Sequence, residues 1–439
     1  MRVFLCQSYL GPVTDIPTVF PIGLAYVASA IRNEHEVHCW DPNVAENPEK
    51  EFPDMLEKIA PDVVGLSLRN VDNAVDSSKN YYYPKFVSMV KTIRDKLPNS
   101  KIIVGGPGFS LFAKEVMQHI PEIDYGVVLE GEHAFAQLLK NLEHPERVNN
   151  VVFRKNGQIH FTELGVFDFK SANLPARDLF DFPKYQSRKY SMNVLSKRGC
   201  EFKCIFCPNA FLSGYSYRLR SPKNVVDEIE QIKNNYGIEN LRFADATFNC
   251  PFNVSSKLCQ ELKERKVGIN WTADFHPAYI NERYMRNAVE SGCTWFNFSP
   301  DGASDRALTM LKKDLTVNDI KKTITIAKKV DGAKVAYGFL HDLPFYNSEH
   351  VSGLSRLVLK MVRELPDKLF GVYITRMRVY PHSELYDIAL KEGKITKNTN
   401  ILYPIYYSST PTLSMENMVM KALKAYYLIE TITKKTIVV

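Results

Sequence analysis

The chain has 439 residues, of which 45% are hydrophobic and 24% are charged, with a formal net charge of +7. This composition is ordinary for a soluble globular protein with room for two or three domains. No apolar run reaches the length of a membrane-spanning helix, and eight cysteines in so long a chain do not suggest a disulfide scaffold. We expect a cytoplasmic protein without a signal peptide. Its basic residues are scattered, which disfavours nucleic acid as a partner.

Short apolar segments alternate with helical patterns over residues 1–150, which we expect to form the first domain. The alternation predicts an α/β domain with a doubly wound parallel sheet, whose ligands bind beyond the carboxyl ends of the strands. We expect strands at 2–6, 35–40, 62–68, 101–104 and 125–129, and helices at 22–32, 51–59 and 83–97. The candidate ligand-binding residues follow three of these strands and are Ser67, Leu68, Arg69, Asn70, Gly105, Gly106, Pro107, Glu130, Gly131 and Glu132.

A second series of strands and helices occupies residues 191–390, after a linker at 151–190 that begins with a hairpin around Asn156-Gly157. Strands are expected at 192–198, 241–247, 269–275, 294–299, 334–340 and 370–379, with amphipathic helices such as 222–235 and 317–330 between them. These six repeats are fewer than the eight of a complete TIM-type barrel, so we expect a partial (β/α)6 barrel. Its chemistry would lie at the carboxyl ends of the strands, where the polar residues are Asp245, Asp274, Ser299, Asp301, His341 and Arg378.

Residues 391–439 are expected to form a small C-terminal capping region with a helix over 415–431. No cysteine follows Cys293, which excludes a second, cysteine-rich iron–sulfur site in this region.

Three cysteines, Cys200, Cys204 and Cys207, have the spacing CxxxCxxC directly after the first strand of the second series. Thiolates bind iron well, and iron–sulfur clusters usually take four of them. A cluster held by three thiolates leaves one iron open, which can chelate a small amino acid through its amine and carboxylate. Two alternatives are structural zinc, which normally requires four ligands although the next cysteine, Cys250, is isolated, and three inert buried thiols.

The segment 199–208, with Phe206 between the last two cysteines, closely resembles that of radical S-adenosylmethionine (SAM) enzymes. The resemblance implies a [4Fe–4S] cluster on the three cysteines that passes one electron to SAM and cleaves it to a 5′-deoxyadenosyl radical. It also implies that Phe206 and Asp245 belong to the cofactor-binding set.

Two later stretches also resemble this family. Residues 301–313 are similar to "ESGS…L…KG", with Asp301 one methylene shorter than the family's glutamate, and this implies that Ser299 and Asp301 face SAM. The alternative is that Asp301 or Ser304 caps a helix. The second stretch, 338–344, is similar to "GFIxGLPGE", and substrate contacts are expected from His341, Asp342 and Tyr346.

The sixth strand of the second series ends with Arg376, Arg378 and Tyr380. The family resemblance implies that contacts to the SAM carboxylate or to substrate come from here, and Arg378 is the cofactor-binding candidate. Pairing of Arg376 on the outer face is equally consistent with the sequence.

The first domain resembles the cobalamin-binding domain that precedes many radical SAM domains, through the segments at 21–26, 67–70, 105–108 and 130–132. A flavodoxin-like domain with glycines serving only as turns is the alternative. The DxHxxG motif that supplies an axial histidine to cobalt is absent. Arg69 is our candidate for the residue that faces the lower side of the corrin, and it has no lone pair for a metal. The alternative is that Arg69 pairs with Asp72 or with a propionamide oxygen.

Together these features imply a cobalamin-dependent radical SAM enzyme, similar to the class B methyltransferases (EC 2.1.1.-), with Arg69 and Asp301 as catalytic candidates. One SAM would methylate cob(I)alamin, a second would be cleaved to the radical, and methylcobalamin would deliver its methyl group to a carbon of a small-molecule or natural-product substrate. Direct polar methylation without the radical is a variant. The alternatives are a non-methylating rearrangement, cyclisation or oxidation, or a non-catalytic carrier or sensor. We expect a monomer that receives electrons from a flavodoxin or ferredoxin.

Overall fold

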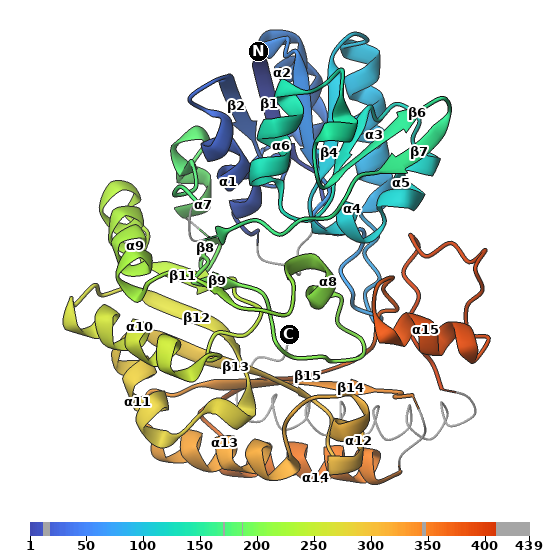
Figure 1. Cartoon of the computed structure of the whole chain (residues 1–439). Helices are drawn as coiled ribbons and strands as arrows, with labels where there is room; N and C mark the ends of the chain where they lie inside the picture. Colours follow the sequence, from blue (N-terminus) through green and yellow to red (C-terminus); the bar gives the residue numbers. More distant parts are fainter. Residues whose placement is uncertain (12–17, 170–171, 187, 345–347, 410–439) are drawn as a thin grey trace.

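The computed structural model describes residues 1–11, 18–169, 172–186, 188–344 and 348–409. This part of the chain contains two large sheets, one of seven strands and one of six. Figure 1 shows the first sheet with its helices above the second, and the short helix α8 (Asn209–Ser213) between them. The expected helix at 415–431 and the expected substrate contact Tyr346 lie outside the described residues.

The first sheet has the strand order β2-β1-β3-β4-β5-β6-β7, and its first five strands are parallel. This confirms the predicted doubly wound sheet. The order reverses between β1 and β3, which is the switch point where ligands of such sheets bind. The bounds of the five parallel strands are β1 (Arg2–Gln7), β2 (Glu36–Trp40), β3 (Val63–Ser67), β4 (Lys101–Gly105) and β5 (Tyr125–Val127).

Both faces of this sheet are covered, because consecutive residues of its apolar strands point to opposite sides. Val3 and Leu5 of β1 pack into one core and Phe4 and Cys6 into another. The first core receives α1 (Ile22–Ile31) and α6 (Gly131–Lys140), and the second receives α2 (Pro48–Ile59), α3 (Tyr83–Lys96) and α5 (Ala113–His119), which follows the short α4 (Pro107–Leu111).

The hairpin that we placed in the linker belongs to the first sheet. Its strands β6 (Val151–Lys155) and β7 (Gln158–Phe161) are antiparallel, and β6 pairs with β5. The turn residues Asn156 and Gly157 both have positive φ, as a two-residue hairpin turn of type I′ requires. A hairpin of this kind can extend a sheet edge without a crossover, so the sheet continues to Phe161 instead of ending at residue 150.

The second sheet has the order β15-β14-β13-β12-β11-β8, with every neighbouring pair parallel. The predicted six-stranded partial barrel is thus confirmed, with bounds β8 (Met192–Val194), β11 (Asn240–Phe243), β12 (Asn270–Phe275), β13 (Cys293–Asp301), β14 (Val335–His341) and β15 (Leu369–Arg376). The predicted strand 192–198 is divided. Its end forms β9 (Lys197–Arg198), which turns away from the sheet and pairs antiparallel with β10 (Arg218–Leu219).

The connecting helices cover the face of the second sheet that points away from the first domain (Figure 1). Their ends follow local sequence signals: α9 begins after Ser221, whose side chain accepts from the Asn224 amide, and ends at Gly237 with φ of +65°. The bounds are α9 (Pro222–Tyr236), α10 (Phe252–Glu264), α11 (Glu282–Glu290), α12 (Asp305–Met310), α13 (Val317–Lys329), α14 (Ser348–Glu364) and, after β15, α15 (Glu384–Lys391). Among the described residues, no helix combines the length and apolar character needed to cross a bilayer.

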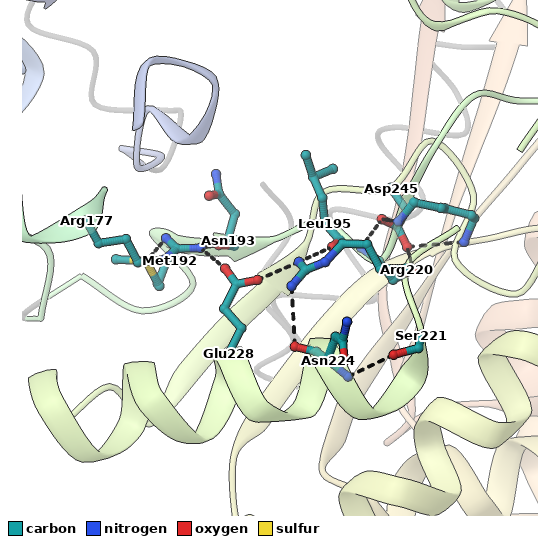
Figure 2. A network of polar contacts seen from close by, with 11 residues as sticks. Arg177, Met192, Asn193, Leu195, Arg220, Ser221, Asn224, Glu228 and Asp245 are labelled. Carbon is teal, nitrogen blue, oxygen red and sulfur yellow. Dashed lines mark hydrogen bonds and ion pairs between the residues drawn. The ribbon is translucent and has the colours of Figure 1, made fainter. Parts of the chain in front are cut away.

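A buried network of charges fixes the start of the second sheet (Figure 2). The Glu228 carboxylate of α9 pairs with Arg177 of the linker at 2.7 Å and with Arg220 at 2.5 Å. The two guanidinium groups also donate to the backbone of β8 and of the residues after it, Arg177 to the Asn193 carbonyl and Arg220 to the Leu195 carbonyl. One carboxylate therefore joins the linker, the first strand and the first helix of the barrel.

Replacing this carboxylate is expected to destabilise the protein, because two buried guanidinium groups would lose their counter-charge. Breaking a buried ion pair costs about 3–5 kcal/mol, and a change of 1 kcal/mol shifts the Tm of a domain of 150–250 residues by roughly 2–4 °C. We expect Glu228→Ala to lower the Tm by about 10 °C in calorimetry. The control is Glu282→Ala, which removes an exposed pair with Arg286 inside one helix and should leave the Tm within about 2 °C. Equal Tm values for the two variants would contradict this role.

Candidate functional site

The three cysteines lie on a loop whose two ends are tied together. β9 precedes the loop and β10 follows it, with Arg198 opposite Arg218 and Lys197 opposite Leu219 in the antiparallel pair. Gly199 has φ of +89°, and a Cβ at this position would lie 2.1 Å from the Ser216 carbonyl oxygen. The chain can therefore turn into the cysteine loop only with glycine here.

The thiols sit in a partly buried, largely neutral environment. Burial raises the pKa of Cys200, Cys204 and Cys207, for Cys204 to about 12, and the nearby Lys313 ammonium opposes this effect at all three. Each thiol is close enough to feel the charge of another of the three. Thiols this hard to ionise need a metal to become thiolates.

The arrangement fits a cluster better than a single metal ion. Within the described ranges, no three His, Cys, Asp or Glu side chains converge as ligands of one ion. Convergence of several ligands on one ion is what the zinc alternative requires. In a cubane cluster each thiolate binds a different iron atom, so the three sulfurs surround the cluster without converging on one point. The donor set fits a [4Fe–4S] cluster with one iron left open.

Aromatic side chains support both halves of the cysteine loop. Phe202 stacks on His276 with ring centroids 4.4 Å apart, and Phe211 stacks on His382 at 3.8 Å. Phe206 packs against the small core formed by Ile205 and residues of α12, β14 and α15. Burial, and then the Lys313 charge, lower the pKa of His276 to about 3, so this ring is neutral at physiological pH.

The loop is also joined to the first domain by a cluster of four charged residues, which we call the interdomain clamp. Arg218 Nη1 lies 2.5 Å from Glu130 Oε2, Arg198 Nη1 lies 3.2 Å from Glu130 Oε1, and Arg198 also pairs with Glu132. The Arg198 guanidinium is stacked 4.3 Å from the centroid of the Phe169 ring. Glu130 and Glu132, which the sequence placed in the cofactor-binding set, thus hold the two ends of the cysteine loop against β5 and α6.

A cavity of about 300 Å³ lies behind this clamp. Its floor is formed by Leu5 of β1 and by the carboxyl ends of β3, β4 and β5, with Gly65, Ser67, Gly105, Gly106 and Pro107, together with Gly131. Its other wall is formed by Leu195, Arg198 and residues of α8. The cavity occupies the switch point of the first sheet and faces the second domain. A ligand of the cobalamin type, which needs an open sheet end and a partner domain, fits this position.

The glycines after β4 serve the packing of the chain as well as the cavity. A Cβ at Gly106 or Gly108 would lie 2.8 or 2.9 Å from the Leu68 carbonyl oxygen. The Gly108 amide donates to the Arg69 carbonyl at 2.8 Å. The two loops after β3 and β4 are therefore locked together, with Arg69 and the exposed Asn70 at the tip.

Arg69 has no ion-pair or hydrogen-bond partner for its guanidinium among the described residues. Asp72, offered by the sequence as its partner, pairs instead with Arg378 at 2.9 Å. Burial lowers the pKa of Arg69 and the charge of Asp41 opposes this. The guanidinium is also close enough to Arg242, on the inner face of the second sheet, to be influenced by its charge.

Two residues of the predicted cofactor-binding set have their polar atoms engaged within the protein. Asp245 accepts from the Ser196 amide at 2.8 Å and pairs with Lys197 at 3.2 Å, so it fixes the residues just before the cysteines. Arg378 donates to Asp72 and to the carbonyl oxygens of Val379 and Ile401. It connects the two domains and has little capacity left for a ligand.

Asp301 and Ser299 lie at the carboxyl end of β13, as expected. Asp301 has φ of +64° and is paired with Lys313 at 2.7 Å. The helix cap suggested as an alternative is made by Ser304, which accepts from the Ala307 amide. Ser299 is half-buried on the same face of the strand as Asn297, which donates to Asp274.

The expected substrate contacts lie at the carboxyl end of β14. Asp342 is fully buried and accepts from the Ser409 amide at 2.6 Å, and its Oδ2 has no partner among the described residues. Arg376 pairs with Asp76 of the first domain at 2.9 Å, and His341 is near this pair. Arg376 therefore contributes to the domain interface and not to the outer face.

Sequence reasoning missed His350, which connects two loops of the site. The Ala303 amide donates to its Nδ1 at 3.1 Å, and its Nε2 lies 2.8 Å from the Leu340 carbonyl oxygen, so Nε2 carries the proton. Burial is the main reason that its pKa is lowered to about 4. A histidine on an apolar helix face was the only available signal. Its two backbone partners could not be inferred from the sequence, because they lie on other segments of the chain.

Two protein families match the chain in consecutive regions. A model described as "B12 binding domain" matches residues 17–139, and one described as "Radical SAM superfamily" matches residues 194–358. The first region contains the switch point and the second begins at the end of β8, just before the cysteine loop.

Several characterised and uncharacterised proteins are similar to this chain. An uncharacterized methyltransferase of Pyrococcus horikoshii is 25% identical over 376 residues, covering 84% of this chain and 78% of that protein. The hopanoid C-3 methylase of Methylococcus capsulatus is 30% identical over 226 residues, covering 48% and 40%. The anaerobic magnesium-protoporphyrin IX monomethyl ester cyclase of Cereibacter sphaeroides is 22% identical over 347 residues, covering 75% and 55%.

A solved structure shares the complete architecture. The radical SAM methyltransferase TsrM from Kitasatospora setae, with tryptophan and the SAM analogue aza-SAM bound, superposes with a TM-score of 0.80 and 16% identity, covering 96% of this chain and 89% of that one. At this identity the similarity shows a common fold. Both domain models match, in this order, so the chain combines a B12-binding domain with a radical SAM domain, and its cofactors are cobalamin, a [4Fe–4S] cluster and SAM.

Proposed function

We propose that this protein is a radical SAM C-methyltransferase (EC 2.1.1.-) that transfers a methyl group to a carbon of a small molecule. The observation that carries the proposal is the interdomain clamp, which fixes the three-cysteine loop against the cavity at the switch point of the B12-binding domain. The similarity to the Pyrococcus methyltransferase over most of both chains supports methyl transfer as the reaction.

The residues of the chain would hold and orient the cofactors, which carry the difficult chemistry. The bound cluster and cobalamin supply the electron for SAM cleavage and the carrier of the methyl group. Cys200, Cys204 and Cys207 would hold the cluster. Arg198 and Arg218, through the clamp, would keep it at a fixed distance from the cavity.

Arg69 is proposed to face the lower side of the corrin. Its guanidinium, which has no partner among the described residues, lies in the loop after β3 and is close enough to Arg242 of β11 to be influenced by its charge, and this supports the role. The group cannot ligate a metal, so it would leave cobalt without a lower ligand from the protein. Ser67, Leu68, Asn70, Gly105, Gly106, Pro107 and Gly131 would form the surrounding surface.

Phe206, Ser299 and Asp301 are proposed to line the SAM side. Phe206 packs beside α12, which follows the end of β13 where Ser299 and Asp301 lie. Asp245 and Arg378 would act by positioning the cysteine loop and the domain interface. His341 and Asp342 are proposed to contact the substrate. The expected electron donor is a flavodoxin or ferredoxin, and the expected state is a cytoplasmic monomer.

The second candidate function is a radical SAM reaction without methyl transfer, such as cyclisation. The similarity to the magnesium-protoporphyrin cyclase, which covers 75% of this chain, supports this second candidate.

Replacing Cys200, Cys204 and Cys207 together by alanine should abolish cluster binding. After anaerobic reconstitution, we expect the variant to contain no iron and to lack the broad visible absorbance of the cluster. Its rate of SAM cleavage should fall by about 100-fold or more, on the order expected when a cofactor ligand is removed. The control is Cys39→Ala, on β2 in the first sheet, which should retain iron and cleavage. Retention of iron by the triple variant would exclude these residues as the ligands.

Methyl transfer can be tested with SAM carrying an isotopic label in its methyl group. The enzyme is incubated with reductant, cobalamin and extracts that contain candidate substrates, and we expect it to transfer the labelled methyl group to a product. A labelled product establishes transfer, whereas an altered product without label would favour the cyclisation or oxidation reading.

The role of Arg69 can be tested by replacing it with a residue whose side chain has a nitrogen lone pair that can bind a metal. In Arg69→His the imidazole can ligate cobalt, so EPR of the cobalt(II) state should show nitrogen hyperfine splitting that the parent protein and Arg69→Lys do not show. We expect methyl transfer by Arg69→His to fall about tenfold or more, on the order of the loss caused by altering a metal's ligand environment. Identical spectra in all three proteins would place Arg69 away from the metal.

A further inference from the structure

We propose that Lys313, held in place by Asp301, supplies a buried positive charge beside the three cysteines and makes their cluster easier to reduce. This inference rests on the proposed function in one respect, which is that Cys200, Cys204 and Cys207 hold a [4Fe–4S] cluster. Neither the family models nor the similar proteins assign a role to this lysine.

Lys313 is fixed in position by an ion pair of its side chain and a hydrogen bond of its backbone. Its Nζ lies 2.7 Å from Asp301 Oδ2, and the two side chains are only 9% and 12% exposed. Its amide donates to the Leu308 carbonyl at 3.0 Å, and the Leu311 carbonyl of the same turn accepts from the amide of Ile205, between two of the cysteines, at 3.2 Å. The turn after α12 is thus hydrogen-bonded directly to the cysteine loop.

Of the two charges in this pair, that of Lys313 has the larger influence on Cys204 and Cys207. Against the effect of burial, which raises the pKa of all three thiols, the Lys313 charge lowers it at each one. Asp301 acts in the opposite direction at Cys204 and Cys207 and is the weaker of the two at both. The net influence of the pair on these two sulfurs is therefore that of a positive charge.

Stability does not explain a buried ion pair at this position. Removing two charges from water costs several kcal/mol per ion, and apolar residues of the same volume often stabilise a protein as well or better. The neighbouring Lys312 shows the ordinary alternative, since it forms a pair with Glu384 in which the side chains are 50% and 45% exposed.

A positive charge here has a clear chemical consequence. Reduction adds one electron to the cluster from an external low-potential donor, and no bond is formed or broken in that step. The added negative charge is stabilised by a nearby cation, and the effect is strong because the site is buried. Net charge and solvent exposure around a cluster are known to set its potential.

The test is a redox titration of the reconstituted holoenzyme before SAM is added, followed by EPR of the reduced cluster. In Lys313→Met we expect the ratio of reduced to oxidised cluster, measured at the midpoint of the parent protein, to fall about tenfold, which is about 59 mV for a one-electron couple. Asp301→Asn should shift the midpoint in the opposite direction, because the ammonium is no longer neutralised. The matched control Lys312→Met should leave it unchanged.

A double variant, Lys313→Met with Asp301→Asn, keeps the test decisive if a single variant fails to fold, because it leaves no unpaired buried charge. Its midpoint should lie below that of the parent protein. Iron-loaded variants that all titrate like the parent would overturn the inference. An unchanged midpoint combined with weaker SAM binding would also overturn it, since Lys313 would then act on the SAM carboxylate. Absence of iron in the parent protein would instead refute the proposed function.

Discussion

The arrangement of this protein depends on the ion pairs of the interdomain clamp. Arg198 and Arg218 stand at the two ends of the cysteine loop, and both pair with acidic residues that follow the fifth strand of the B12-binding domain. A loop that carries a cluster would otherwise be free to move relative to a cofactor bound on the other domain. Because the charges are buried, water and salt weaken them little, and their geometry fixes both the approach of the domains and the size of the cavity behind them.

Much of the fold was accessible from the sequence because its strands are short, apolar and separated by amphipathic helices. The five parallel strands of the first sheet and the six of the second occur where they were predicted, although β5, β11 and β15 end two, four and three residues earlier than expected. The exceptions are local. The hairpin at 151–161 was expected in the linker because nothing in a hairpin specifies which sheet edge it joins. The bend between β8 and β9 is not visible in the sequence, where 192–198 has the pattern of one continuous strand.

The candidate site was predictable in part, for a physical reason. The spacing of the cysteines is a local feature, so the sequence alone identifies them. The partners of Glu130, Asp72 and Asp301 lie about 70, 300 and 12 residues away, respectively, on segments brought together only by folding. A charged residue at a strand end can serve a ligand or another charged residue, and the sequence cannot distinguish these uses. Arg378 and Asp245 illustrate the second use, because their polar atoms are bound within the protein.

His350 gives the mouth of the barrel a mechanical linkage. A single imidazole bridges the backbone after β13 to the end of β14, so neither segment can shift without pulling on the other. A molecule that binds against His341 and Asp342 and displaces the end of β14 would therefore also displace the turn that begins at Asp301. In this way recognition at one rim of the barrel would reach the electrostatic surroundings of the sulfurs.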